Sequence, residues 1–165
     1  MIEKGTRAPD FTLTSDSGEA VTLSKLRGSP VVLYFYPRDD TPGCTAQACG
    51  IRDAWVEFER AGVVVLGVSP DGEASHVKFK EKYDLPFTLL ADTDHAVADA
   101  YGVWAEKSYA GKRYMGVDRS TFVIDADGNV ANVFLKVKPA EHADQVLAAL
   151  SASGKRTARI IRWSD

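Results

Sequence analysis

The chain has 165 residues, of which 45% are hydrophobic and 26% are charged, and its formal net charge is −3. This length is typical of one domain with a substantial core, and this composition excludes a disordered or fibrous protein. The near balance of 20 basic and 23 acidic residues gives no electrostatic basis for binding nucleic acid or an anionic membrane. We therefore expect a soluble globular domain that acts on a small, neutral substrate.

The N-terminal segment lacks the apolar run of a signal peptide, and no stretch approaches the roughly 18 apolar residues that span a bilayer. We therefore expect a cytoplasmic protein. Its two cysteines are too few for a disulfide scaffold. A reducing compartment would also keep a merely structural bridge open, so a pair that matters there is expected to be redox-active.

The first third of the chain predicts a hairpin, a buried strand and a helix. Extended runs at Phe11–Thr14 and Ala20–Leu23 flank a Ser-Asp-Ser-Gly turn and predict an N-terminal hairpin. The continuous apolar run Pro30–Tyr36 predicts a central strand that is covered on both faces. Apolar residues then recur at helical spacing from Gly43 to Gly62, which predicts one long helix.

Strands and helices alternate through the rest of the chain, which predicts a parallel α/β sheet followed by a strand pair and a last helix. The expected elements are a strand at Val63–Val68, a helix at Ala74–Tyr83, a strand at Phe87–Leu90, a helix at His95–Tyr101, strands at Thr121–Ile124 and Val130–Val137, and a helix at Ala140–Leu150. This order, preceded by a hairpin, predicts an α/β thioredoxin-like fold with an N-terminal β-hairpin extension.

The C-terminal segment differs in composition from the rest, so we divide the chain into a domain at residues 1–152 and a basic tail at residues 153–165. In the tail, basic residues surround Ile160, Ile161 and Trp163 without a long periodic run. We interpret it as a surface tail. The alternative is a docking segment for a partner, which the sequence does not name.

Cys44 follows the loop that leaves the predicted central strand, so it lies in the first turn of the next helix. Thr41 suits the N-cap of that helix and Pro42 suits its first position. Unpaired amide donors and the positive end of the helix dipole then face the sulfur and favour the thiolate over the thiol. A lone cysteine is more often a small buried hydrophobe, but this strand-to-helix corner favours a reactive one.

Cys49 lies five residues after Cys44. On an intact helix this spacing separates the two Cα atoms by roughly 8–9 Å, which exceeds the reach of about 7 Å for a disulfide. The pair can therefore join only if the first helical turns unwind. A zinc site is an alternative for paired cysteines, but two further ligands at the usual spacing are absent from the sequence.

Several strings of this sequence are similar to those of one protein family. The pattern Pro37-x-x-x-Thr41-x-x-Cys44 resembles the active-site signature of peroxiredoxins, and DDTPGCTAQACGIRD resembles their Q-type subgroup, the bacterioferritin comigratory proteins. The strings KYDLPFTLLAD, YGVW and DRSTFVIDADG resemble the same subgroup in the same order. The resemblance covers about residues 4–150, and Gln47 stands where many relatives have Glu.

The resemblance implies a thiol-dependent peroxidase that reduces hydrogen peroxide and organic hydroperoxides. Cys44 would be the peroxidatic nucleophile and form a sulfenic acid, and Cys49 would resolve it as an intramolecular disulfide. Thr41 would offer its hydroxyl to the peroxide, and Pro37 would shield the pocket. Arg119 would supply a cation beside the sulfur and the charge that develops during attack.

The resemblance also implies the partners. Thioredoxin or a glutaredoxin-like dithiol protein would reduce the disulfide, and no metal, flavin or haem would take part. A monomer is expected, with a weak homodimer as the alternative. Two other functions stay open on the residues alone: a thiol–disulfide oxidoreductase, against which the five-residue cysteine spacing argues, and a redox-sensing or chaperone-like binding module.

Other candidate residues receive structural interpretations. His76, His95 and His142 lack cysteine or carboxylate partners at diagnostic spacing, so we interpret them as surface histidines. The segment Asp92–Asp94 is typical of a loop and helix N-cap rather than a calcium site. Taken alone, Arg119 is equally well explained as a surface ion-pair partner.

Overall fold

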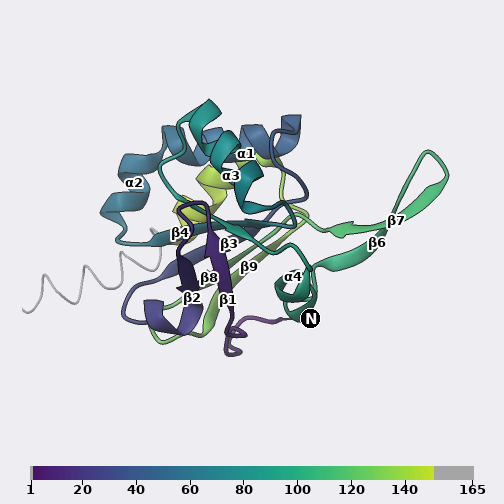
Figure 1. Ribbon diagram of the computed structural model, residues 1–165. Coiled ribbons are helices and arrows are strands. Elements are labelled where there is room, and N and C mark those ends of the chain that lie inside the picture. The colour runs from purple at the N-terminus through teal and green to yellow at the C-terminus, as the bar shows by residue number, and fades with distance from the viewer. Residues whose placement is uncertain (1, 151–165) are drawn as a thin grey trace, which may run out of the picture.

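In the computed structural model, which describes residues 2–150, strands and helices alternate through most of the chain (Figure 1). The elements are β1 (Thr12–Ser15), β2 (Ala20–Thr22), η1 (Leu23–Leu26), β3 (Val31–Phe35), α1 (Pro42–Asp53), α2 (Trp55–Arg60), β4 (Val64–Ser69), α3 (Glu73–Tyr83), β5 (Thr88–Ala91), α4 (Ala96–Ala100), β6 (Trp104–Tyr109), β7 (Lys112–Val117), β8 (Ser120–Ile124), β9 (Val130–Leu135) and η2 (Pro139–Glu141). A further helix covers residues 142–150.

Seven of the strands form one mixed sheet in the order β2-β1-β5-β4-β3-β8-β9. Strand β4 pairs in parallel with both β3 and β5, as the alternation of strands and helices predicts. The N-terminal hairpin of β1 and β2 is confirmed, and β1 pairs antiparallel with β5, so β2 is the edge strand of the sheet. The last two strands, β8 and β9, pair antiparallel beside β3.

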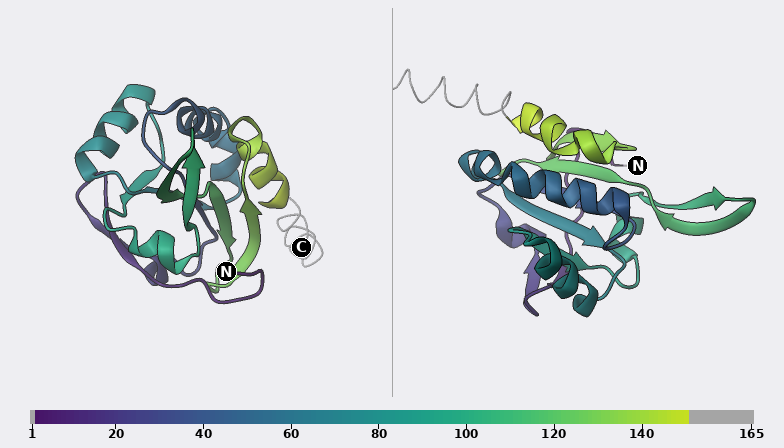
Figure 2. Two further views of the ribbon diagram at one scale, coloured as in Figure 1. Left: turned by 90° about the vertical axis from the view of Figure 1, so that its right-hand side faces the viewer. Right: turned by 90° about the horizontal axis from the view of Figure 1, so that it is seen from above.

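Strand β3 lies in the middle of this sheet and is buried along its whole length, as its apolar run predicts. Alternate side chains point to opposite faces of a strand, so β3 contributes to two separate cores. Val31, Leu33 and Phe35 join the core on the α4 face, and Val32 and Tyr34 join the core on the other face. Helices α1 and α3 and the helix at 142–150 cover that second face, with α1 between the other two (Figure 2).

The single long helix predicted after Gly43 is wrong, because the structure divides it into α1 and α2 at Ala54. Ala54 has φ −101° and ψ 16°, and its N–H is directed at the carbonyl groups of both Arg52 and Gly50. Directly after the break, the Trp55 ring packs on Phe87, with 6.2 Å between the ring centroids. No proline marks this position in the sequence, so the periodic pattern alone did not indicate the break.

Strands β6 and β7 form a separate two-stranded hairpin that the sequence analysis missed. The hairpin projects from the body of the molecule (Figure 1), and most of its side chains are exposed or only half-buried, so no alternation of apolar and polar residues marks it. Ala110 and Gly111 form its turn with φ values of 51° and 80°. Two central residues at positive φ are typical of a tight hairpin turn, and Asn-Gly would have been the stronger signal.

The predicted tail at residues 153–165 lies outside the described residues, so both interpretations of it stay untested. Among residues 2–150 no helix combines the length and the apolar character needed to cross a membrane.

Candidate active site

Cys44 lies in the first turn of α1, at the end of the loop that leaves β3. Its backbone position agrees with the sequence prediction, with Thr41 at the N-cap and Pro42 at the first helical position. The side chain is 1% exposed and belongs to the core beneath α1. The sulfur is therefore shielded from bulk water and lies at the positive end of a helix.

Arg119 lies directly before β8 and reaches the sulfur across 75 residues of chain. Its Nη2 donates a hydrogen bond to Cys44 Sγ at 3.4 Å, and its Nη1 donates to Gln47 Oε1 at 2.6 Å. Gln47 is fully buried one turn further along α1, so it fixes the orientation of the guanidinium. The structure thus brings Arg119 and Cys44 together in a geometry that suits a cation stabilising an anionic sulfur.

Gly43 makes this approach possible. A Cβ atom at this position would lie 3.0 Å from Arg119 Nη2 and 3.5 Å from Pro139 Cγ. A distance of 3.0 Å is tighter than side chains ordinarily allow, so the guanidinium would have to shift. The residue before Cys44 is therefore a glycine for a steric reason.

The Thr41 hydroxyl does not cap α1, which corrects the prediction of a side-chain N-cap. It donates instead to the carbonyl oxygen of Arg38 at 2.9 Å and so tightens the loop before the helix. Thr41 and Pro37 are both half-buried on this loop. A hydroxyl donor is thus held three residues before Cys44, within the same segment.

Cys49 is half-buried on the same helix as Cys44, and both thiols are free. The continuous helix between them confirms that the two residues share α1. The spacing of five residues on one helix keeps the Cα atoms roughly 8–9 Å apart, beyond disulfide reach. A bond between these two sulfurs requires α1 to unwind.

Two of the three histidines are buried, which contradicts their interpretation as surface residues. His76 is 0% exposed and His142 is 1% exposed. His95 is half-buried and its ring stacks on Trp104, with 4.0 Å between centroids. The sequence did carry one signal for His76: it lies three residues before Phe79 and thus shares the apolar face of α3.

His142 lies at the start of the helix at 142–150 and packs against the Tyr34 ring, with 5.4 Å between centroids. Its Nε2 lies 2.7 Å from the hydroxyl of Thr121. Burial and then the positive charge of Arg119 lower the pKa of His142 to about 4. This histidine is therefore neutral at pH 7.

The N-cap residue of α4 is His95 rather than a residue of the predicted segment Asp92–Asp94, but Asp92 still binds the first turn of that helix. The buried carboxylate accepts hydrogen bonds from the backbone N–H groups of Val97 and Ala98, at 3.1 and 2.9 Å. Within residues 2–150 no group of three or more His, Cys, Asp or Glu side chains is arranged to hold a metal ion.

Comparisons with known proteins agree with this arrangement. A model of the AhpC/TSA family matches residues 4–133. The chain is 49% identical over 149 residues to peroxiredoxin Bcp of Bacillus subtilis, which covers 90% of this chain and 95% of that protein. It is also 49% identical over 146 residues to peroxiredoxin Bcp of Escherichia coli, covering 88% and 94% of the two chains.

Solved structures are similar over nearly the same length. The bacterioferritin comigratory protein of Xanthomonas campestris has a TM-score of 0.83 and 41% identity, with 87% of this chain and 91% of that chain covered. A PrxQ mutant of Xylella fastidiosa has a TM-score of 0.88 and 31% identity, with coverage of 93% and 98%. These similarities confirm the predicted thioredoxin-like fold.

Proposed function

Because the chain belongs to the AhpC/TSA family and is a thiol-dependent peroxidase of the peroxiredoxin type, we propose that it reduces hydrogen peroxide and organic hydroperoxides through Cys44 and Cys49. The observation that carries the proposed roles is the contact of Arg119 Nη2 with Cys44 Sγ at 3.4 Å. A cation fixed beside a buried sulfur at a helix N-terminus supports a thiolate nucleophile.

In the first step, the Cys44 thiolate attacks one oxygen of the peroxide. The S–O bond forms while the O–O bond breaks, so sulfur loses two electrons and the peroxide gains them. The leaving oxygen takes a proton and departs as water or an alcohol. Arg119 stabilises the charge that spreads over sulfur and oxygen, and the Thr41 hydroxyl, once it leaves the Arg38 carbonyl, donates to the peroxide. Pro37 limits the entry of water to the pocket.

In the second step, the Cys49 thiolate attacks the sulfur of the Cys44 sulfenic acid. The S–S bond forms and the sulfenic oxygen leaves as water after it takes a proton. This intramolecular disulfide requires residues of α1 to unwind. A dithiol protein such as thioredoxin or a glutaredoxin-like protein then supplies two electrons and restores both thiols.

We further propose that residues 1–152 carry this reaction as a monomer in the cytoplasm, because an intramolecular disulfide needs no second subunit. A weak homodimer is the alternative. Light scattering of the reduced and oxidised protein at several concentrations tests this proposal, and a stable dimer in both redox states would contradict it.

The decisive experiment compares Cys44→Ser with Cys49→Ser in peroxide consumption. We expect Cys44→Ser to have no activity, and Cys49→Ser to consume about one equivalent of peroxide and then stall, because attack and resolution belong to different sulfurs. Each variant is assayed with hydrogen peroxide and an alkyl hydroperoxide, and with thioredoxin and glutaredoxin as reductants. Full turnover by Cys44→Ser would contradict the assignment.

A further inference from the structure

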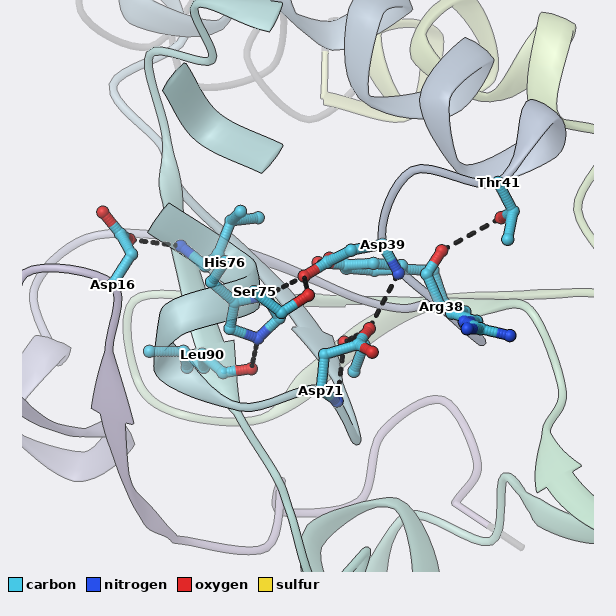
Figure 3. A network of polar contacts seen from close by, with 11 residues as sticks. Asp16, Arg38, Asp39, Thr41, Asp71, Ser75, His76 and Leu90 are labelled. Carbon is cyan, nitrogen blue, oxygen red and sulfur yellow. Dashed lines mark hydrogen bonds and ion pairs between the residues drawn. The ribbon is translucent and has the colours of Figure 1, made fainter. Parts of the chain in front are cut away.

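A buried carboxylate holds the loop between β3 and α1. The Asp39 side chain is 4% exposed and accepts hydrogen bonds from three donors (Figure 3). These are the Tyr36 hydroxyl at 2.5 Å, the Ser75 hydroxyl at 2.8 Å and His76 Nδ1 at 2.7 Å. Two of the donors come from α3, so Asp39 ties the loop to that helix. Together the three donors occupy both oxygens of the carboxylate.

The second nitrogen of His76 fixes its protonation. Nε2 lies 2.8 Å from the carbonyl oxygen of Leu90, which only accepts, so Nε2 carries a proton. Nδ1 faces the Asp39 carboxylate, so a further proton lies between these two groups. Burial lowers the pKa of His76, but the hydrogen bond and charge of Asp39 outweigh it, and the net shift is upward. The nearby carboxylate of Asp71 adds to this shift. His76 and Asp39 form a buried ion pair.

Three further hydrogen bonds attach the same loop to α3 and to the segment before it. The Asp39 N–H donates to Asp71 Oδ2 at 2.7 Å, and Asp71 in turn accepts from the Ser69 hydroxyl. Asp40 has φ 58°, a left-handed conformation that costs free energy in residues other than glycine. Its side chain is bonded to Lys82 and Tyr83 at the exposed end of α3.

The hydrogen bonds of Asp39 with Tyr36, Ser75 and His76 are called the anchor below. The position of the anchor affects both chemical steps. Asp39 lies three residues before the start of α1, and Cys44 and Cys49 can join only when α1 unwinds. A fixed loop holds Cys44 beside Arg119 and opposes the unwinding. Resting on the function proposed above, we propose that Asp39 and His76 are positioning residues that hold Cys44 in the helical arrangement for peroxide attack and set how readily α1 unwinds for the disulfide.

The test uses the full-length chain with Asp39→Asn and His76→Asn, which remove the charges and keep a hydrogen-bonding side chain at each position. Lys80→Ala is the matched control. Lys80 lies on the same helix, one turn after His76, and its half-buried ion pair with Asp16 at 2.8 Å does not involve the loop. The control therefore removes an ion pair of α3 without releasing the anchor.

Two readouts need no peroxide. Amide hydrogen exchange of the reduced protein is expected to be about tenfold faster over residues 39–55 in both variants and unchanged in β9. In a glutathione buffer, the Cys44–Cys49 disulfide is expected to become about tenfold more favoured, or about 30 mV more reducing, because only the reduced helical state loses the anchor. Lys80→Ala is expected to leave both values at the wild-type level.

Stopped-flow kinetics separate the two chemical steps. Sulfenic acid formation, followed in the Cys49→Ser background, is expected to be slower by about tenfold when Cys44 is less well positioned. Disulfide formation with Cys49 present is expected to be faster. A simple loss of folded protein would slow both steps by the same factor, so opposite changes distinguish positioning from instability.

A milder variant keeps the proposal testable if the charge-removing variants fail to fold. Ser75→Ala removes one hydrogen bond to Asp39 and leaves the ion pair in place, and it is expected to give smaller changes in the same directions. Wild-type exchange and disulfide equilibrium in all three variants would overturn the proposal. Because exchange and equilibrium are measured without peroxide, their outcome stays separate from a failure of the peroxidase assignment.

Discussion

The two buried histidines flank α1, and their pKa values are shifted in opposite directions. His76, on the α3 side, faces the Asp39 carboxylate and the Leu90 carbonyl, two acceptors that together require protons on both ring nitrogens. His142, on the side of the helix at 142–150, faces one hydroxyl, and burial and then the positive charge of Arg119 lower its pKa, so its ring stays neutral at pH 7.

Burial alone does not explain this difference, because both side chains are almost completely removed from solvent. The sign of the neighbouring charge explains why the two pKa values differ, because a carboxylate stabilises the imidazolium and a guanidinium destabilises it. The histidine that faces Asp39 lies on the side that holds the loop before Cys44. The neutral histidine lies beside Arg119, where a second positive charge would repel the guanidinium that contacts Cys44.

The largest expected effect on the free energy of unfolding comes from removing the side chain that pairs with each buried histidine. Asp39→Ala leaves a buried charge unpaired and is expected to lower the free energy of unfolding by about 3–5 kcal/mol. Thr121→Val removes only a neutral partner of His142 and is expected to lower it by about 1–2 kcal/mol. Urea denaturation at pH 7 measures both. Equal losses would mean that the charge of the pair contributes nothing further to the free energy of unfolding.

Arg119 contacts Cys44 and also lowers the pKa of His142, so its removal is expected to change both the reaction rate and that pKa. Arg119→Ala is expected to slow the reaction with peroxide by about 100-fold or more, the usual scale for losing a charge-stabilising group. The pKa of His142 is expected to rise, because Arg119 contributes to lowering it. Stopped-flow fluorescence and an NMR titration of the imidazole provide the two measurements. An unchanged rate would make Arg119 an ordinary surface cation.

The dependence of stability on pH is expected to differ in sign between the two histidines. The pKa of His142 is lowered from 6.5 to about 4, so the unfolded chain binds more protons in this range, and stability falls as pH drops through it. The loss reaches about 3 kcal/mol. The pKa of His76 is raised above 6.5, so its contribution is complete below pH 6.5 and is lost as pH rises through the higher value.

Denaturation curves between pH 4.5 and 8.5 for His142→Phe, His76→Asn and the wild type measure these two contributions. Subtracting each variant from the wild type is expected to give slopes of opposite sign on the two sides of pH 6.5. Slopes of the same sign would contradict the assigned charge states.

The smallest expected effect concerns the two glycines of α1. Gly43→Ala places a Cβ atom 3.0 Å from Arg119 Nη2, so we expect peroxide reduction to slow by about tenfold. Gly50→Ala is the control, because its Cβ meets only Ala143 at 3.8 Å. It is expected to stabilise the helix by about 0.5–1 kcal/mol and to slow disulfide formation rather than peroxide attack. Identical kinetics of the two variants would contradict the steric role of Gly43.

The sequence predicted the features that depend on neighbouring residues. The buried strand β3, the corner that carries Cys44, and the shared helix of Cys44 and Cys49 were all expected from local pattern. The contact of Arg119 with Cys44 spans 75 residues, and only the family resemblance suggested it. The partnership of Asp39 and His76 was missed, because nothing in the local pattern of either residue indicates the other.

The exposed hairpin of β6 and β7 was missed for a different reason. Its strands bury few side chains, so the pattern that marks a strand in a core is absent. The Thr41 hydroxyl was assigned to the helix cap, but the nearby Arg38 carbonyl competes for it. Short polar side chains have several backbone partners within reach, and the sequence does not rank them.

The 75 residues that follow Cys44, up to and including Arg119, also matter during synthesis of the protein. At roughly 5–20 residues per second, a ribosome needs about 4–15 s to add them. During this interval the nascent chain contains Cys44 but not yet Arg119, and it also lacks strand β8, which pairs with β3. The sulfur thus gains its contact with Arg119 only after β8 has been synthesised and has paired with β3, so this site is completed late in synthesis.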